Sequence, residues 1–124
     1  MISTTPNLPP ETIELFEQGN IGLFEINDEG TVLYCRAFAE KFFYEKSAAS
    51  VGRNFFDDVA PFENMEELRR HFNKFIKSHS STTNFSFNCR IKSRSIPAKV
   101  MLVRIVERSN TERAEFTIVD IRKI

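Results

Sequence analysis

The chain has 124 residues, which is about the length of one domain with a single hydrophobic core. Its 17 basic and 17 acidic residues balance, so no charge excess indicates nucleic acid or a membrane surface as the partner. The aromatic composition is unusual, because 13 residues are Phe, 2 are Tyr and none is Trp. This bias predicts a core rich in phenylalanine, unless some of the rings line a ligand cavity instead.

The sequence shows no targeting or membrane-spanning segment. Its first 20 residues lack a basic stretch followed by an apolar run, and no run approaches the roughly 18 apolar residues of a membrane helix. Cys35 and Cys89 have neither the CxxC nor the Cys/His spacing of a zinc site. We therefore expect a cytoplasmic protein without a metal, whose reduced thiols are small core residues.

The chain begins with a segment, residues 1–20, that we expect to dock on the rest as a cap. Pro10 and the acidic residues after it suit the start of a helix, and Gly19 suits its end. A helix this short is marginal alone, so its apolar residues Leu15 and Phe16 should be buried against another surface.

A hairpin and two short helices are expected next. Residues 21–26 and 31–35 are predicted strands, joined by a turn whose Asn, Asp and Gly residues tolerate positive φ. Residues 37–45 predict a short helix. Asn54 is placed to cap a brief helix that contains Phe55 and its neighbour Phe56.

The second half of the chain predicts one long helix followed by three strands. Apolar residues recur at helical spacing over residues 63–78. Residues 84–92 alternate apolar and polar, as in a strand with one buried face. Pro97 is expected to open a strand over 98–107, and 114–122 form the last strand. The predicted fold is α+β: a five-stranded antiparallel sheet with helices packed on one face.

The strand over 98–107 is apolar on both faces, which predicts an interface. Alternation points Met101 away from Val100 and Leu102, so a second apolar surface lies on the other side of the sheet. Large apolar patches are uncommon on soluble monomers. We expect the cap segment, a second copy of the chain or both to cover this surface, with the interface residues Leu15, Phe16, Met101, Val103, Ile105 and Ile118.

Residues 52–61, Gly-Arg-Asn-Phe-Phe-Asp-Asp-Val-Ala-Pro, resemble the run before the chromophore cysteine in the photoactive yellow protein family of PAS domains. The likeness continues through the phenylalanines of the long helix and through residues 97–100. The hairpin over 28–33 and the ending over 119–121 resemble those of PAS domains in general. The resemblance implies a PAS domain over residues 21–124, preceded by the cap segment.

The departures from that family concern the chromophore. Phe62 stands where the family has the cysteine that binds p-coumarate as a thioester, and a phenyl ring has no nucleophile. Cys35 aligns with the tyrosine that contacts the chromophore, and the partner glutamate falls near Ala39. The resemblance therefore implies a module that is not photoactive and has no cofactor.

Two functions are favoured by these residues, and haem binding through His71 is a third, less favoured one. The favoured one is a sensory and interaction module, not an enzyme, that relays signals by contact with a protein partner or by dimerisation. The alternative is a sensor of a small apolar ligand, which would bias two states of the domain by differential affinity. Its pocket would be lined by Phe24, Cys35, Phe38, Phe42, Phe55, Phe56, Phe62, Phe72 and Phe87.

The polar candidates indicate surface roles. His71 borders the apolar stripe of the long helix, so we interpret it as a rim residue rather than a haem ligand, and His79 as a surface residue. Asp57 and Asp58 are adjacent and point apart, which suits a turn or cap and not two-carboxylate catalysis. A solvated basic rim is expected on or near the outer sheet: Arg90, Lys92, Arg94, Lys99 and Arg104.

Overall fold

The computed structural model describes residues 20–36, 50–59, 62–91 and 93–124. Its strands are β1 (Asn20–Ile26), β2 (Val32–Arg36), β3 (Thr82–Ile91), β4 (Arg94–Arg108) and β5 (Arg113–Lys123). Its helices are the π-helical turn η2 (Phe55–Val59) and the α-helix α3 (Met65–Lys77). The cap helix expected within residues 1–20 and the short helix expected over 37–45 lie outside the described residues.

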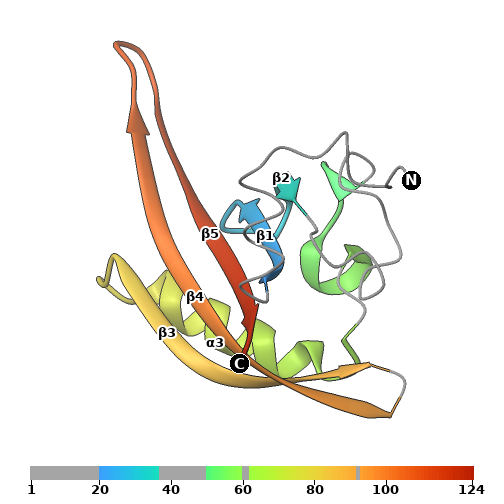
Figure 1. Cartoon of the computed structure of the whole chain (residues 1–124). Coiled ribbons are helices and arrows are strands. Elements are labelled where there is room, and N and C mark those ends of the chain that lie inside the picture. The colour runs from blue at the N-terminus through green and yellow to red at the C-terminus, as the bar shows by residue number, and fades with distance from the viewer. Residues whose placement is uncertain (1–19, 37–49, 60–61, 92) are drawn as a thin grey trace, which may run out of the picture.

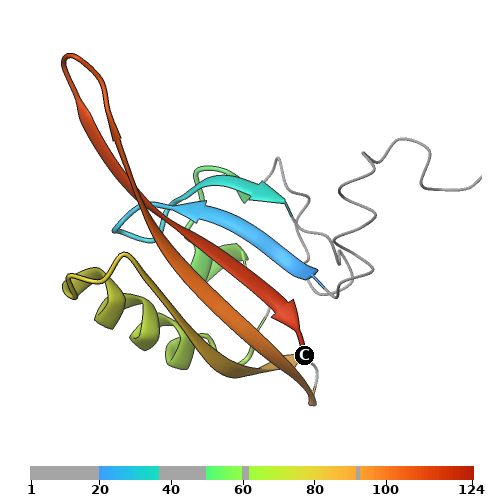
Figure 2. The same cartoon turned by 60° about the vertical axis from the view of Figure 1, so that its left-hand side comes forward.

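The five strands form one antiparallel sheet in the order β2-β1-β5-β4-β3 (Figure 1). The first and last strands that the structure describes are therefore neighbours inside the sheet, and β3 is an edge strand. α3 lies on one face beside β3 and β4 (Figure 2). The predicted α+β architecture is confirmed, because the alternating strands bury one face against the helical layer.

The hairpin of β1 and β2 turns at residues 27–30, as the sequence predicts. The side-chain Oδ1 of Asn27 accepts hydrogen bonds from the backbone N–H groups of Glu29 (3.0 Å) and Thr31 (2.9 Å), which closes the turn. Gly30 has a φ of +91°, a conformation that side-chain-bearing residues rarely adopt. A Cβ atom there would also lie only 3.2 Å from the ring of Phe56, so the turn packs directly on η2.

Asn54 caps η2, which confirms the predicted cap. Its Oδ1 accepts hydrogen bonds from the backbone N–H groups of Phe56 and Asp57, both at 2.9 Å. The backbone N–H of Phe55 donates to the carbonyl oxygen of Gly30 at 2.8 Å. Capping and this contact with the hairpin together direct Phe55 and Phe56 toward the sheet, where both are buried.

α3 confirms the long predicted helix, with ends one or two residues inside the expected range. Its buried residues, among them Leu68, Phe72 and Phe75, repeat at helical spacing and face the core. Acidic residues occupy its first turn and Lys77 its last, which complements the helix dipole. The helix is thus amphipathic, and burial of its apolar side accounts for its position on the sheet.

One prediction about the strands is wrong: Pro97 does not open β4 but lies inside it. β4 begins at Arg94, and Pro97 pairs with Asn88 of β3. The carbonyl oxygen of Pro97 accepts a hydrogen bond from the N–H of Ile124 (3.0 Å), so the nitrogen of Pro97 also points toward β5. The regular pairing of β4 with β5 starts only at Ala98, so the missing N–H removes no ladder bond.

Candidate functional site

The interior contains a row of phenylalanine rings contributed by three elements. The ring centroids of Phe24 and Phe55 lie 4.6 Å apart, and those of Phe55 and Phe56 lie 5.1 Å apart in an edge-to-face arrangement. The ring of Phe72 on α3 continues the row at 5.2 Å from Phe56. These spacings are those of favourable aromatic pairs, so β1, η2 and α3 meet through direct ring packing.

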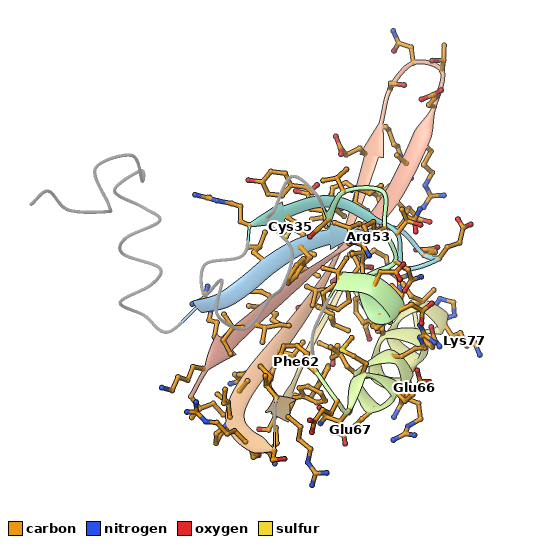
Figure 3. The ribbon with its side chains drawn as sticks, turned by 90° about the vertical axis from the view of Figure 1, so that its right-hand side faces the viewer. Cys35, Arg53, Phe62, Glu66, Glu67 and Lys77 are labelled. Carbon is orange, nitrogen blue, oxygen red and sulfur yellow. The ribbon has the colours of Figure 1, made fainter. Side chains whose placement is uncertain are left out.

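Phe62 and Phe87 form a second aromatic contact. Their centroids are 6.1 Å apart at an interplanar angle of 67°, and both side chains are buried. Phe62 lies on the segment between η2 and α3 (Figure 3). The position that the family resemblance assigns to the chromophore cysteine therefore carries a buried hydrocarbon ring, which excludes thioester formation there.

The structure brings together every predicted pocket residue that it describes. Seven of the nine are buried members of one hydrophobic cluster: Phe24, Cys35, Phe55, Phe56, Phe62, Phe72 and Phe87. Phe38 and Phe42 lie outside the described residues. The set is thus a contiguous part of the core, and its role as a ligand pocket stays a prediction.

Cys89 is a buried and unreactive thiol. It is 0% exposed, and burial raises the pKa of its thiol to about 12. The thiolate, which is the nucleophilic and metal-binding form, is therefore absent near neutral pH. Within the part of the chain that the structure describes, no group of three or more His, Cys, Asp or Glu side chains is placed to hold a metal ion.

The face of the sheet opposite α3 carries the predicted interface residues of β4 and β5. Val103 pairs with Ile118, and Met101 pairs with Asp120 in the same alternating set. Met101 is 38% exposed, whereas Val103 and Ile118 are partly buried. Ile105 follows on the same face, and we call this surface the outer face. The predicted residues Leu15 and Phe16 lie outside the described residues.

An ion pair on the outer face between a buried carboxylate and an exposed arginine was not foreseen from the sequence. The side chain of Asp120 is only 8% exposed, and its Oδ2 lies 3.1 Å from Nη2 of Arg122. A pocket of about 250 Å³ adjoins this pair and is also lined by Asn84, Lys99 and Met101. The spacing of two residues on a strand, which places both side chains on one face, was the signal available in the sequence.

The prediction that Arg104 belongs to a basic rim on or near the outer sheet is wrong. Its guanidinium lies on the helical side of the sheet, where Nη2 donates to the carbonyl oxygens of Phe75 (2.7 Å) and Ile76 (3.3 Å). The same group lies 5.0 Å from the centroid of the Phe75 ring. It therefore binds the carbonyl end of α3, where a cation is favoured, and does not belong to the outer face.

The histidines lie away from the aromatic interior. The imidazole of His71 stacks on the ring of Phe85, with centroids 3.8 Å apart and an interplanar angle of 9°. This contact is on the side of α3 next to β3, outside the row formed by Phe55, Phe56 and Phe72. His79 is exposed after the end of α3.

Asp57 has a structural partner. Its carboxylate forms an ion pair with the guanidinium of Arg69, which also pairs with Glu66 at 3.3 Å. The Arg69 guanidinium lies 5.2 Å from the centroid of the Phe56 ring. This cluster joins η2 to α3, in keeping with the local role expected for Asp57.

None of the described helices is long and apolar enough to cross a membrane. No protein-family model and no curated protein matches the sequence. Solved structures of other proteins do resemble this one.

The photoactive yellow protein domain of the sensor histidine kinase Ppr from Rhodospirillum centenum aligns with a TM-score of 0.62 at 18% identity, over 91% of this chain and 99% of that chain. The PAS domain of BvgS from Bordetella pertussis aligns with a TM-score of 0.61 at 12% identity, over 92% of this chain and 83% of that chain. The PAS domain of the RpfR quorum-sensing receptor from Cronobacter turicensis, in complex with BDSF, gives 0.56 at 14% identity, over 86% and 94%. Because identities this low establish architecture alone, the conclusion concerns the fold: this chain adopts the PAS fold.

Proposed function

We propose that this domain is a sensory and interaction module that is not photoactive and that works by protein contact through the outer face. The observation that carries the proposal is the apolar set Met101, Val103, Ile105 and Ile118 on the face of the sheet opposite α3. Burial of such residues at an interface removes apolar surface from water.

The direct packing of the aromatic rings in the interior supports a function that the surface of the domain carries out. The rings of Phe24, Phe55, Phe56 and Phe72 contact one another directly, so their packing couples the sheet to η2 and α3. Interiors packed in this way resist continuous deformation. A change at one side of the sheet is then transmitted as a shift of whole elements, which suits the relay of a signal between surfaces.

The proposal is tested by self-association of the full chain. We expect sedimentation velocity to show a dimer that Val103→Glu dissociates, because the substitution places a charge within the apolar set. Met101→Lys should act likewise, and its ammonium would face Asp120 across the β4–β5 pairing, which keeps the monomer stable.

Val106→Glu is the matched control. Val106 is 40% exposed, close to the 38% of Met101, but alternation places it on the opposite face of β4. The control should leave the dimer intact. A wild-type chain that stays monomeric at high concentration, or a dimer that survives both outer-face variants, contradicts dimerisation through the outer face.

A sensor of a small apolar ligand is the second candidate function. Its support is the contiguous buried set that includes Cys35, Phe62 and Phe87, together with the ligand complex of the RpfR PAS domain. That structural neighbour is also known in complex with C12:0. A saturable rise in the melting temperature of this chain with C12:0 would support ligand sensing, whereas an unchanged melting temperature up to the solubility limit would contradict it for this ligand.

A further inference from the structure

The open edge of β3 is a feature that the proposed outer-face contact does not use. Among the described strands β3 pairs with β4 alone, so backbone groups that point away from β4 have no neighbouring strand in this part of the structure. These groups belong to the residues with even numbers. The carbonyl oxygen of Ser81 bonds to the N–H of Arg104 on β4, whereas the N–H and carbonyl of Arg90 bond in the opposite direction, to Asn64 and Glu63.

Asn64 closes only one end of this edge. Its Nδ2 donates to the carbonyl oxygen of Asn88 at 2.7 Å, and its Oδ1 accepts from the N–H of Arg90 at 3.2 Å. At Thr82, Asn84 and Ser86 the outward backbone groups have no hydrogen-bond partner among the residues that the structure describes. Among the described residues, the edge from Thr82 to Ser86 is therefore free to pair with another strand.

The usual devices that protect an edge strand are missing from this stretch. Residues 82–88 contain neither proline nor lysine, and the pairing of β3 with β4 runs without a bulge from Thr82 to Ile91. Natural sheets normally interrupt a long regular edge with one of these features, because such an edge recruits other strands. An open regular edge favours addition of an extended peptide.

A groove beside the free edge supplies side-chain selectivity. It has a volume of about 220 Å³, and its walls include His71 and Lys74 of α3 with Thr83 and Phe85 of β3. His71 is held against Phe85 by ring stacking at 3.8 Å. No acidic residue lines the groove, and Lys74 has no ion-pair partner in the described part of the chain. The groove therefore suits a carboxylate.

We propose that the edge of β3 between Thr82 and Ser86 binds an extended acidic peptide as an additional strand. Backbone groups of the peptide pair with Asn84 and Ser86, and every second side chain lies on the helical side of the sheet. A glutamate or aspartate opposite Thr83 or Phe85 then enters the groove beside Lys74. Two copies of the chain paired through β3 would instead bring both Lys74 side chains to one edge, which their like charges disfavour.

The test uses the full chain and a fluorescein-labelled peptide that alternates glutamate and valine. We expect saturable binding by fluorescence anisotropy, together with amide shifts at Thr82, Asn84 and Ser86 in NMR spectra. A peptide that alternates lysine and valine should bind more weakly. The glutamate–valine peptide with N-methyl groups on all backbone amides should lose binding, because it cannot donate the ladder hydrogen bonds in any register or orientation.

Ser86→Pro removes an N–H that faces the free edge and no bond to β4, so the fold persists while peptide binding is lost. Lys74→Glu should weaken binding of the acidic peptide by about three- to tenfold and improve binding of the lysine peptide. Lys77→Glu is the control, because this substitution makes the same charge change at an exposed position of α3 (Figure 3). Lys77 does not line the groove.

Four results would overturn the proposal. They are absence of binding by the glutamate–valine peptide up to millimolar concentration, equal effects of the Lys74 and Lys77 variants, shifts confined to other strands, and a dimer that Ser86→Pro dissociates. The last result would assign the edge to a second copy of the chain. Dissociation by Val103→Glu reports on the outer face and is independent of these outcomes.

Discussion

Replacement of Phe55 by alanine measures how completely the rings fill the interior. Phe55 is 0% exposed, and its ring contacts those of Phe24 at 4.6 Å and Phe56 at 5.1 Å. Removal of a buried phenyl ring from a close-packed site costs about 3–5 kcal/mol of the free energy of unfolding, because transfer and cavity terms add. That loss is large beside the roughly 5–15 kcal/mol of a typical domain.

Phe55→Leu separates the ring contacts from the loss of volume. Leucine keeps much of the buried hydrocarbon but removes two aromatic pairs, each worth about 0.5–1.5 kcal/mol beyond area burial. We therefore expect Phe55→Leu to lower the free energy of unfolding by about 1–3 kcal/mol. Phe116→Ala, at a half-buried position on β5, should cost less than Phe55→Ala and serves as the control.

The assay is urea unfolding followed by circular dichroism, since the chain has no Trp to report by fluorescence. A further expectation is that benzene raises the melting temperature of Phe55→Ala more than that of the wild type, because an apolar cavity stays dry and binds such ligands. The reasoning fails if Phe55→Ala costs less than about 1 kcal/mol at an unchanged m-value. Such a result would mean that the ring already borders an open chamber.

Three other predictions concern single side chains. Arg104→Met should lower the free energy of unfolding by about 1.5–3 kcal/mol, because it removes the charged donor from the carbonyl end of α3. The exposed control Arg108→Met should change this free energy little. Equal effects of the two variants in urea unfolding would show that the contacts of Arg104 contribute nothing specific. Asn54→Ala should lower the free energy of unfolding by about 1–2 kcal/mol, because the η2 cap is lost, whereas the control Asn84→Ala should change it little. Thermal melts compare the two variants, and equal melting temperatures would contradict a stabilising cap. Since the pKa of Cys89 rises from 9.0 to about 12 on folding, the unfolded chain releases this proton first, so the contribution of the thiol to stability is complete below pH 9 and declines as pH rises toward 12. Urea midpoints of the wild type and Cys89→Ala should therefore converge above pH 9, and a constant difference between them would exclude this linkage.

The sequence by itself determined the elements with strong periodicity. Alternation of Phe85, Phe87 and Cys89 with polar residues defined β3 and its buried face, as the burial of Phe87 and Cys89 confirms. The spacing of Leu68 and Phe72 defined α3, because a helical repeat places such residues on one side. These features depend only on residues close in sequence, so local patterns suffice to predict them.

The family resemblance added the PAS fold and identified Phe62 as the position where the nucleophilic cysteine is missing. Residue patterns alone would have left open which strands are neighbours, since several antiparallel orders satisfy five alternating segments. In the observed order β1 lies between β2 and β5, so the first and last described strands in sequence are paired inside the sheet. This order was not among the predictions, because it depends on pairing between segments that are distant in sequence.

Tertiary structure alone decided the polar contacts between residues that are distant in sequence. The sequence predicts that Arg104 is a surface cation, but its partners are carbonyl groups of α3 that lie 28 and 29 residues away along the chain. Asn64 likewise closes part of the β3 edge from a distance of 24 residues, which left Thr82 to Ser86 open. Hydrophobic burial follows a repeating local pattern, whereas a hydrogen bond depends on the position of one distant atom, so the first could be predicted from sequence and the second required the fold.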